Sequence, residues 1–140
     1  MNQAKNILIL GSIPGTDQEK VELYEALIDA CKSALPTFTI LSPMGAQTLA
    51  KDDNEKRRNV FQKIKKASLI IGDLTSESTA QGVEMREAET KKKPFIITAK
   101  TGSRISGIVS ASPSLKMKIF YNDLNDVKIQ LIDVLKTLEF

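Results

Sequence analysis

Short apolar runs separated by longer amphipathic segments recur along the whole chain. Most of the runs carry β-branched side chains, and runs of this length are typical of strands that are buried on both faces. We therefore predict five strands, at residues 6–10, 38–41, 69–72, 95–98 and 118–121. The third run ends at Asp73, which is the first polar side chain after it.

Between the strands, apolar residues recur at every third or fourth position, as they do on one face of a helix. The first helix follows a turn at 11–15, where Thr16 and Glu19 match a capping box, and it ends before Pro36. Four more helices are predicted. One begins at Asn54 or Glu55, two cover about 81–92 and about 105–109, and the last follows a cap at Asn125.

This alternation of strands and helices predicts the fold class. Short connections between such elements favour parallel strands joined by right-handed crossovers. We therefore expect an α/β protein, a single-domain Rossmann- or flavodoxin-like three-layer sandwich with a five-stranded parallel sheet. The carboxyl ends of its strands would gather Gly11, Ser12, Ser42 and the segments 73–78 and 98–106 at one edge.

Composition indicates the class of protein and the compartment in which we expect it. The chain has 140 residues, of which 41% are hydrophobic and 26% charged, as in an ordinary one-domain protein. The segment before the first strand is too short for a signal peptide, and no apolar run approaches the roughly 20 residues of a membrane helix. The single cysteine, Cys31, lies on an apolar helix stripe. We expect it to pack in a core, in a protein of the reducing cytoplasm.

The absence of histidine changes the candidate chemistry most. It excludes Ser-His-Asp and Cys-His nucleophile systems and histidine-based metal sites. The turn at 11–15 has neither the spacing of a dinucleotide fingerprint nor that of a P-loop. We expect no metal and no cofactor, so catalysis would depend on carboxylates, lysine, tyrosine, serine or backbone groups.

One helical segment is strongly basic. Residues 51–66 include seven basic and three acidic residues, which give a local net charge of +4 against +3 for the whole chain. A nucleic-acid surface is one interpretation. The only aromatic residue of the segment, Phe61, lies on its apolar stripe and does not interleave with the charges. We therefore favour a solvated helix face and expect no nucleic-acid partner.

Five short motifs, in order, resemble those of the nucleoside 2-deoxyribosyltransferase superfamily, most closely its 2'-deoxynucleoside 5'-phosphate N-hydrolases. They are Gly11-Ser12-Ile13, Leu23-Tyr24-Glu25, Asp73-Leu74-Thr75, Ser78-x-x-x-Gly82-x-Glu84 with Ala88 and Lys93-Pro94 after it, and Ser103-Arg104-Ile105-Ser106. The resemblance covers nearly the whole chain, so it implies one domain of this type over residues 1–140.

The resemblance implies cleavage of the N-glycosidic bond of a 2'-deoxynucleoside or its 5'-monophosphate. Glu84 would attack the anomeric carbon, and water or a second base would then take the sugar. In the phosphate-specific branch, serines at the positions of Ser78 and Ser106 hold the 5'-phosphate, and the latter comes from the neighbour in a homodimer. The implied substrate-binding residues are Gly11, Ser12, Asp73, Ser78, Gly82 and Ser106.

The residues themselves agree in part with these roles. A carboxylate such as Glu84 near the first turn of a helix gains from the helix dipole, which favours its ionised form. Hydroxyl and backbone N–H groups at a helix start, as at Ser78, suit a phosphate. Without the resemblance, the alternative is a helix-stabilising glutamate and a capping serine. We also expect Ser12, Asp73, Ser78 and Glu84 to open on one cleft.

Three positions depart from the family pattern. Leu8 stands where the family has a tyrosine, Val60 where it has an aspartate, and Pro14 where the phosphate branch has an arginine. The family uses the tyrosine and aspartate to position the substrate and to assist proton transfer to the leaving base. A catalytically impaired nucleotide-binding protein on the same fold therefore remains the alternative. A flavodoxin-like or regulator-like signalling domain is a third possibility, without an evident acidic cluster to support it.

Overall fold

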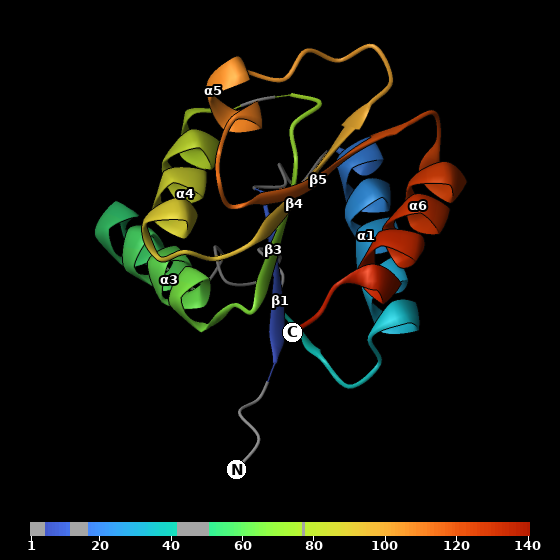
Figure 1. The fold of residues 1–140 in the computed structure, drawn as a ribbon. Coiled ribbons are helices and arrows are strands. Elements are labelled where there is room, and N and C mark those ends of the chain that lie inside the picture. Colours follow the sequence, from blue (N-terminus) through green and yellow to red (C-terminus); the bar gives the residue numbers. More distant parts are fainter. Residues whose placement is uncertain (1–4, 12–16, 42–50, 77) are drawn as a thin grey trace.

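The computed structural model describes residues 5–11, 17–41, 51–76 and 78–140 and forms a parallel sheet between two layers of helices (Figure 1). The predicted fold class is confirmed. The sheet has the strand order β2-β1-β3-β4-β5, and every neighbouring pair is parallel. The strands are β1 (Asn6–Leu10), β2 (Thr39–Leu41), β3 (Leu69–Asp73), β4 (Phe95–Lys100) and β5 (Leu115–Tyr121).

The helices cover both faces of this sheet. They are α1 (Gln18–Ala34), α3 (Asp53–Lys66), α4 (Thr79–Thr90), α5 (Gly107–Ser110) and α6 (Leu124–Thr137). Helices α1 and α6 pack against each other on one face, and α3 and α4 lie together on the other (Figure 1). The short α5 lies on the same side as α4, next to its upper end in this view.

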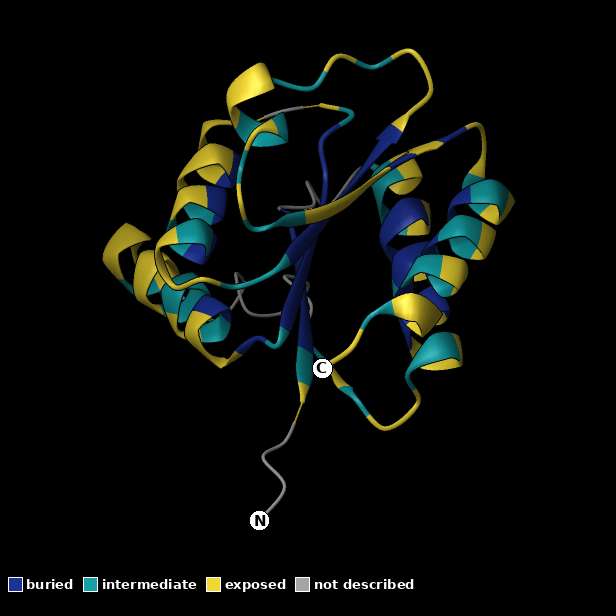
Figure 2. Ribbon diagram, in the orientation of Figure 1, coloured by how far each residue is buried: buried dark blue, intermediate teal, exposed yellow. Residues whose placement is uncertain are grey.

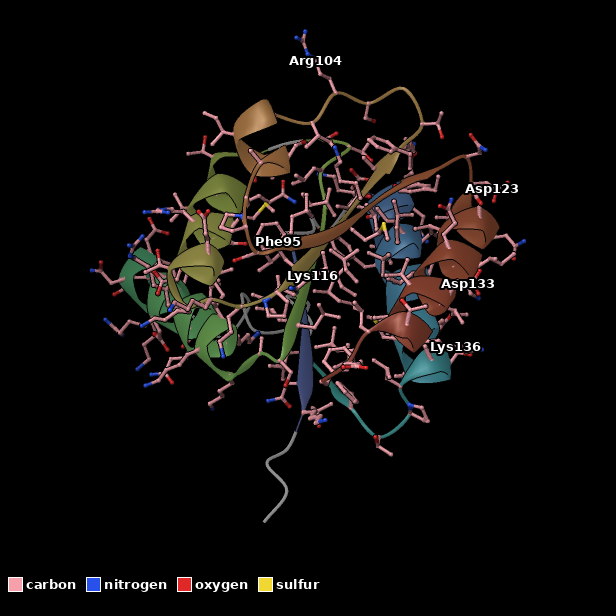
Figure 3. The ribbon with its side chains drawn as sticks, viewed as in Figure 1. Phe95, Arg104, Lys116, Asp123, Asp133 and Lys136 are labelled. Carbon is pink, nitrogen blue, oxygen red and sulfur yellow. The ribbon has the colours of Figure 1, made fainter. Side chains whose placement is uncertain are left out.

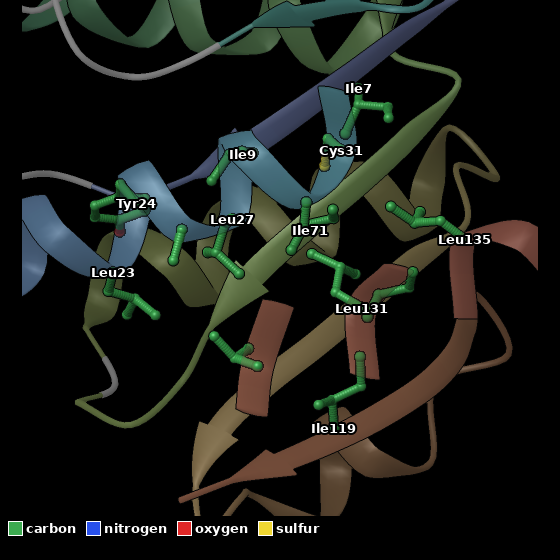
Figure 4. Close-up of a cluster of buried hydrophobic side chains, with 14 of the residues drawn as sticks. Ile7, Ile9, Leu23, Tyr24, Leu27, Cys31, Ile71, Ile119, Leu131 and Leu135 are labelled. Carbon is green, nitrogen blue, oxygen red and sulfur yellow. The ribbon is translucent and has the colours of Figure 1, made fainter. Parts of the chain in front are cut away.

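Alternation of side chains along the strands gives each helical layer its own core. Ile7, Ile9 and Ile71 point toward α1 and α6, where they meet Leu27 and Leu131 (Figure 4). Leu8, Leu10, Ile70 and Ile97 point the other way, toward α3 and α4. Figure 2 shows the result, with buried strands at the centre and helices exposed only on their outer faces. Burying one such side chain contributes about 1.5–3 kcal/mol.

Cys31 belongs to the core on the α1 and α6 side, as its position on the apolar stripe predicted. Burial raises the pKa of its thiol to about 12. A thiol that remains protonated at neutral pH is a poor nucleophile. Cys31 is therefore a packing residue of the fold.

Two helix starts differ from the prediction. Asp123, and not Asn125, caps α6 by accepting a hydrogen bond from the backbone N–H of Asp126 at 2.8 Å. Asp17 caps α1 in the same way through the N–H of Lys20 at 3.0 Å, while Thr16 lies outside the described residues. An aspartate at either start both accepts this bond and interacts favourably with the helix dipole.

Candidate functional site

The strand order places a topological switch point between β1 and β3, because the chain leaves β1 in one direction along the sheet and β3 in the other. In open parallel sheets, ligands bind in the crevice at the carboxyl ends of the strands next to this point. Here these ends are Gly11, which follows β1, and Asp73, which closes β3. The neighbouring side chains of α1 and α4 therefore define the candidate site.

Gly11 allows a close approach between α1 and the end of β1. The Tyr24 hydroxyl donates a hydrogen bond to the backbone oxygen of Leu10 at 3.2 Å. A Cβ atom on Gly11 would lie 1.5 Å from this hydroxyl oxygen, and the residue has a φ of +139°. Only glycine fits such a backbone conformation without strain. Gly11 therefore has a definite structural role at the predicted position.

Asp73 is a buried carboxylate with several hydrogen-bond donors. Its Oδ2 accepts from the Thr98 hydroxyl at 2.7 Å and from the Tyr121 hydroxyl at 2.9 Å. Its Oδ1 accepts from the backbone N–H of Thr75 at 3.1 Å. Burial raises the pKa of Tyr121, and the charge of Asp73 raises it further. The phenol therefore stays protonated and holds the carboxylate in place.

The start of α4 is built by Ser78 and Gln81. The Ser78 hydroxyl accepts from the backbone N–H of Gln81 at 3.2 Å, and the Gln81 side chain accepts from the N–H of Ser78 at 3.1 Å. This is a reciprocal capping box. Gln81 is buried, and its amide donates to the backbone oxygen of Asp73 at 2.8 Å. The capping interpretation of Ser78 is confirmed, and the helix begins before the predicted residue 81.

Glu84 consequently lies in the second turn of α4, so the prediction of a position near the first turn is wrong. The effect of the helix dipole weakens beyond the first turn. Burial instead dominates and raises the pKa of Glu84 to about 7. The expected preference for the ionised form is therefore not observed. At neutral pH this carboxyl is present in both protonation states.

Two cavities lie at this end of the sheet. The larger, about 430 Å³, contains Asp73, Ser78 and Gln81 among its lining residues. The smaller, about 290 Å³, is lined by Lys56, Arg57, Asn59, Val60, Phe61, Ala80, Val83 and Glu84. The described residues therefore do not place Glu84 in one cleft with Asp73 and Ser78. The division runs along α4, where Ser78 and Gln81 line the larger cavity with Asp73, and Ala80, Val83 and Glu84 line the smaller one.

Tyr24 connects the two cavities electrostatically. It lines the larger cavity, and its pKa is raised to about 12 by burial first, and then by the negative charges of Asp73 and Glu84. The charges of both carboxyl groups therefore act on the Tyr24 hydroxyl, which is hydrogen-bonded to the end of β1.

Of the positions that depart from the family pattern, Val60 lines the same cavity as Glu84, and Pro14 lies outside the described residues. Asn59, next to Val60, also lines this cavity, whereas Arg58 is exposed and is not among its lining residues. Leu8 is 2% exposed and packs in the core beneath α3 and α4. Val60 and Leu8 carry no group that donates a proton or a hydrogen bond. Asn59 can donate a hydrogen bond from its amide.

Three predicted binding residues lie away from these cavities or outside the description. Gly82 is exposed on α4, and a Cβ atom there would meet nothing within 4 Å among the described atoms. Ser106 is the residue before α5, and neither cavity includes it among the described lining residues. Ser12 lies outside the described residues. Their roles in binding remain predictions.

Sequence reasoning placed Thr98 at this edge of the sheet without giving it a role, and it missed Tyr121 as a member of the site. Both lie at the carboxyl half of a strand and point to the same side as Asp73. The available signal was a polar or phenolic side chain that closes an apolar run, as Thr98 and Tyr121 do in the predicted strands. Such residues at strand ends line the ligand crevice of this architecture.

The described part of the chain contains no group of three or more acidic or cysteine side chains arranged to hold a metal ion. Among the described helices, none is long and apolar enough to cross a membrane.

No family model and no curated protein matches this sequence. Several solved structures match its fold. The CMP N-glycosidase BcmB of Clostridium botulinum aligns at 13% identity with a TM-score of 0.71, over 91% of this chain and 98% of that one. The 2-deoxyribosyltransferase of Bacillus psychrosaccharolyticus aligns at 18% identity with a TM-score of 0.66, over 96% and 93%.

A 2-deoxyribosyltransferase of Leishmania mexicana aligns at 14% identity with a TM-score of 0.59, over 91% of this chain and 97% of that one. The chain has the 2-deoxyribosyltransferase fold. At these identities the likeness shows the fold alone, and function must be argued from the site. In this chain, Glu84 is half-buried and lines its cavity together with Val60, while Leu8 packs in the core beneath α3 and α4.

Proposed function

We propose that this chain is an N-glycosidase or deoxyribosyltransferase-like enzyme that cleaves the N-glycosidic bond of a 2'-deoxynucleoside or its 5'-monophosphate. The observation that carries the proposal is Glu84, a half-buried carboxyl on the wall of a cavity, with its pKa raised to about 7. Strongly shifted carboxyls in cavities concentrate at functional sites. The fold shared with an N-glycosidase and two 2-deoxyribosyltransferases supports the same conclusion.

The smaller cavity suits a nucleobase next to Glu84. Val60, Phe61, Ala80 and Val83 form an apolar wall, and the Arg57 guanidinium lies 4.3 Å from the centre of the Phe61 ring. Flat heterocycles bind against apolar and guanidinium surfaces of this kind. A base in this cavity would place its bond to the sugar within reach of Glu84.

The reaction then takes two displacements. An ionised oxygen of Glu84 bonds to the anomeric carbon while the bond to the base nitrogen breaks, and the electron pair leaves on the base. Water then attacks the same carbon and releases Glu84 as a carboxylate. The proton of this water ends on the departed base, so that free base and free sugar are the products. A second base in place of water gives transfer instead of hydrolysis.

Proton supply to the leaving base is the weak part of this site. Leu8 and Val60 replace the tyrosine and aspartate that the family resemblance implies. A positioned acid typically contributes about a hundredfold to ten-thousandfold in rate. We therefore expect slow turnover of natural nucleosides and faster turnover of a deoxyribosyl substrate with an activated phenol as leaving group. The same substitutions favour the second candidate, a nucleotide-binding protein on this fold that has lost catalysis.

A homodimer belongs to the proposal. The family resemblance supports it, because Ser106 would reach the site of the other protomer; Ile108, two residues later and 88% exposed, would then lie at or beside the interface. Light scattering at micromolar concentration should give twice the mass of the chain, and Ile108→Asp should give the monomer. A monomeric wild-type protein contradicts this part.

The deciding experiment measures release of free base from each deoxynucleoside and each 5'-monophosphate. Glu84→Gln removes the nucleophile and keeps the size of the side chain, so release should stop. Glu87→Gln is the matched control, because Glu87 lies on the same helix, pairs with Lys91 and contributes to neither described cavity. Ligand binding without release in the wild type supports the second candidate. Release that is unchanged in Glu84→Gln rejects the proposed nucleophile.

A further inference from the structure

The larger cavity is unusually acidic for a site expected to hold a phosphate. Asp17, Glu19, Glu22, Asp73 and Asp123 line it, against Lys20 and Lys100. Among the described lining residues, five carboxylates and two lysines give a formal net charge of −3. A cavity with one sign of charge repels ligands of the same sign.

One of the two lysines is already engaged. The Lys100 ammonium forms a salt bridge with Glu19, and this hydrogen bond and the charge of Glu19 raise the pKa of Lys100. Arg104, from the segment that resembles the phosphate-binding motif of the family, points outward from the protein (Figure 3). Pro14 stands where the phosphate branch of the family has an arginine. The described residues therefore offer little positive charge to a phosphate here.

Helix N-termini do not compensate for this charge. The residues that cap α1, α4 and α6, namely Asp17, Ser78 and Asp123, all line the larger cavity. A free helix N-terminus would attract an anion. In α1 and α6, however, the carboxylate of the capping aspartate already accepts a hydrogen bond from a backbone N–H group of the helix start. In α4, the Ser78 hydroxyl and the Gln81 side chain accept such hydrogen bonds. These starts are thus capped from within the protein.

We infer that Asp17, Glu22 and Asp123 are specificity-determining residues that exclude a 5'-phosphate, so that the substrate is an uncharged deoxynucleoside. This inference rests on the proposed function. The two cavities adjoin at the first turn of α4, where Ser78 and Gln81 line the larger one and Ala80 the smaller one. With the base in the apolar smaller cavity, the 5' end of the sugar would therefore be directed toward the larger one. The hydroxyl-rich lining there, including Thr75 and Tyr121, suits a 5'-hydroxyl group. The family resemblance alone favoured the phosphate branch, and the charges of this cavity point the other way.

Binding to Glu84→Gln tests the inference independently of turnover. Isothermal titration of this variant with a deoxynucleoside and its 5'-monophosphate should give at least about tenfold tighter binding of the nucleoside, equivalent to about 1.4 kcal/mol. The ratio should shrink as salt is added, because salt screens the repulsion. Equal or tighter binding of the monophosphate at low salt overturns the inference.

Charge-neutralising variants identify the residues responsible. Asp17→Asn and Asp123→Asn keep a good N-cap side chain, so both proteins should fold. Each should improve binding of the monophosphate and leave that of the nucleoside nearly unchanged. Asp133→Asn is the matched control, because Asp133 lies on α6 away from the cavity (Figure 3). An unchanged nucleoside-to-monophosphate ratio in both cavity variants contradicts the assignment.

The outcomes separate this inference from the proposed function. If the nucleoside binds preferentially but the wild type releases no base, the specificity stands and the glycosidase proposal fails. If base is released most rapidly from the monophosphate, the glycosidase proposal stands and the specificity is wrong. If neither ligand binds to Glu84→Gln or to the wild type, both are rejected.

Discussion

Glu84 combines burial with a place on a cavity wall, and this combination sets how it should respond to pH. Only the ionised carboxyl can attack the anomeric carbon. Because its pKa is raised to about 7, the rate of base release should increase as pH rises through 7. At pH 5 the rate should be about a hundredfold below its plateau. Initial rates between pH 5 and 9 measure this, and a flat or falling profile contradicts it.

The same pKa predicts a change in stability. Folding raises the pKa of Glu84 from 4.5 to about 7, so between these values the native state binds more protons than the unfolded state. The contribution of Glu84 to the free energy of unfolding is therefore fully present below pH 4.5 and is lost as the pH rises to about 7. At pH 8, Glu84→Gln should be more stable than the wild type by at most about 3 kcal/mol.

Urea unfolding of the two proteins at pH 5 and pH 8 tests this prediction. The difference between their free energies of unfolding reports the contribution of Glu84 alone, because all other titratable groups are present in both proteins. Glu87→Gln should follow the wild type at both pH values. A Glu84→Gln protein less stable than the wild type at pH 8 would show that the native carboxylate has a favourable partner.

Gly11 provides a second residue-scale prediction. Gly11→Ala would place a Cβ atom against the Tyr24 hydroxyl in a conformation with positive φ, so it should destabilise the fold by roughly 2–4 kcal/mol. Tyr24→Phe should relieve only part of this, because the ring carbon Cζ would still lie 2.5 Å from the new atom. Thermal unfolding of both single variants and the double variant measures the effect. An unchanged melting temperature in Gly11→Ala contradicts this packing.

Among the elements, α4 matters most because its start fixes the position of Glu84. Ser78→Ala removes one half of the capping box and should cost about 1 kcal/mol. Gln81→Ala should cost more, roughly 2 kcal/mol, because it also leaves the buried backbone oxygen of Asp73 without its donor. Ser110→Ala, just inside the end of α5, is a control with little expected effect. Equal stability of Gln81→Ala and the wild type contradicts this role.

The elements also show what the sequence can predict. Apolar runs located β1 and β3 to within one residue, since buried parallel strands need continuous apolar side chains. Helix starts were less certain, because several polar residues near each start can cap and only the backbone geometry selects one. Asp123 was selected instead of Asn125. For α4, this selection moved Glu84 from the expected first turn into the second.

At the scale of the whole molecule, the alternation of elements was enough to predict the parallel sheet and its two helical layers. The candidate site was predicted only in part. The resemblance located Glu84 and the facing position Val60. It could not show that Asp73 and Glu84 line different cavities, because this depends on how α4 is turned over the strand ends. Nor could it show the burial that raises the pKa of Glu84.

The central claim is that Glu84 bonds covalently to the sugar, and intact-mass spectrometry tests it most directly. The wild-type protein is mixed with a deoxynucleoside, quenched in acid and weighed, and digestion then locates any adduct. The account predicts a mass increase of one deoxyribosyl group on the peptide that contains Glu84, absent in Glu84→Gln and present in Glu87→Gln. Base release without this adduct and undiminished in Glu84→Gln would contradict it.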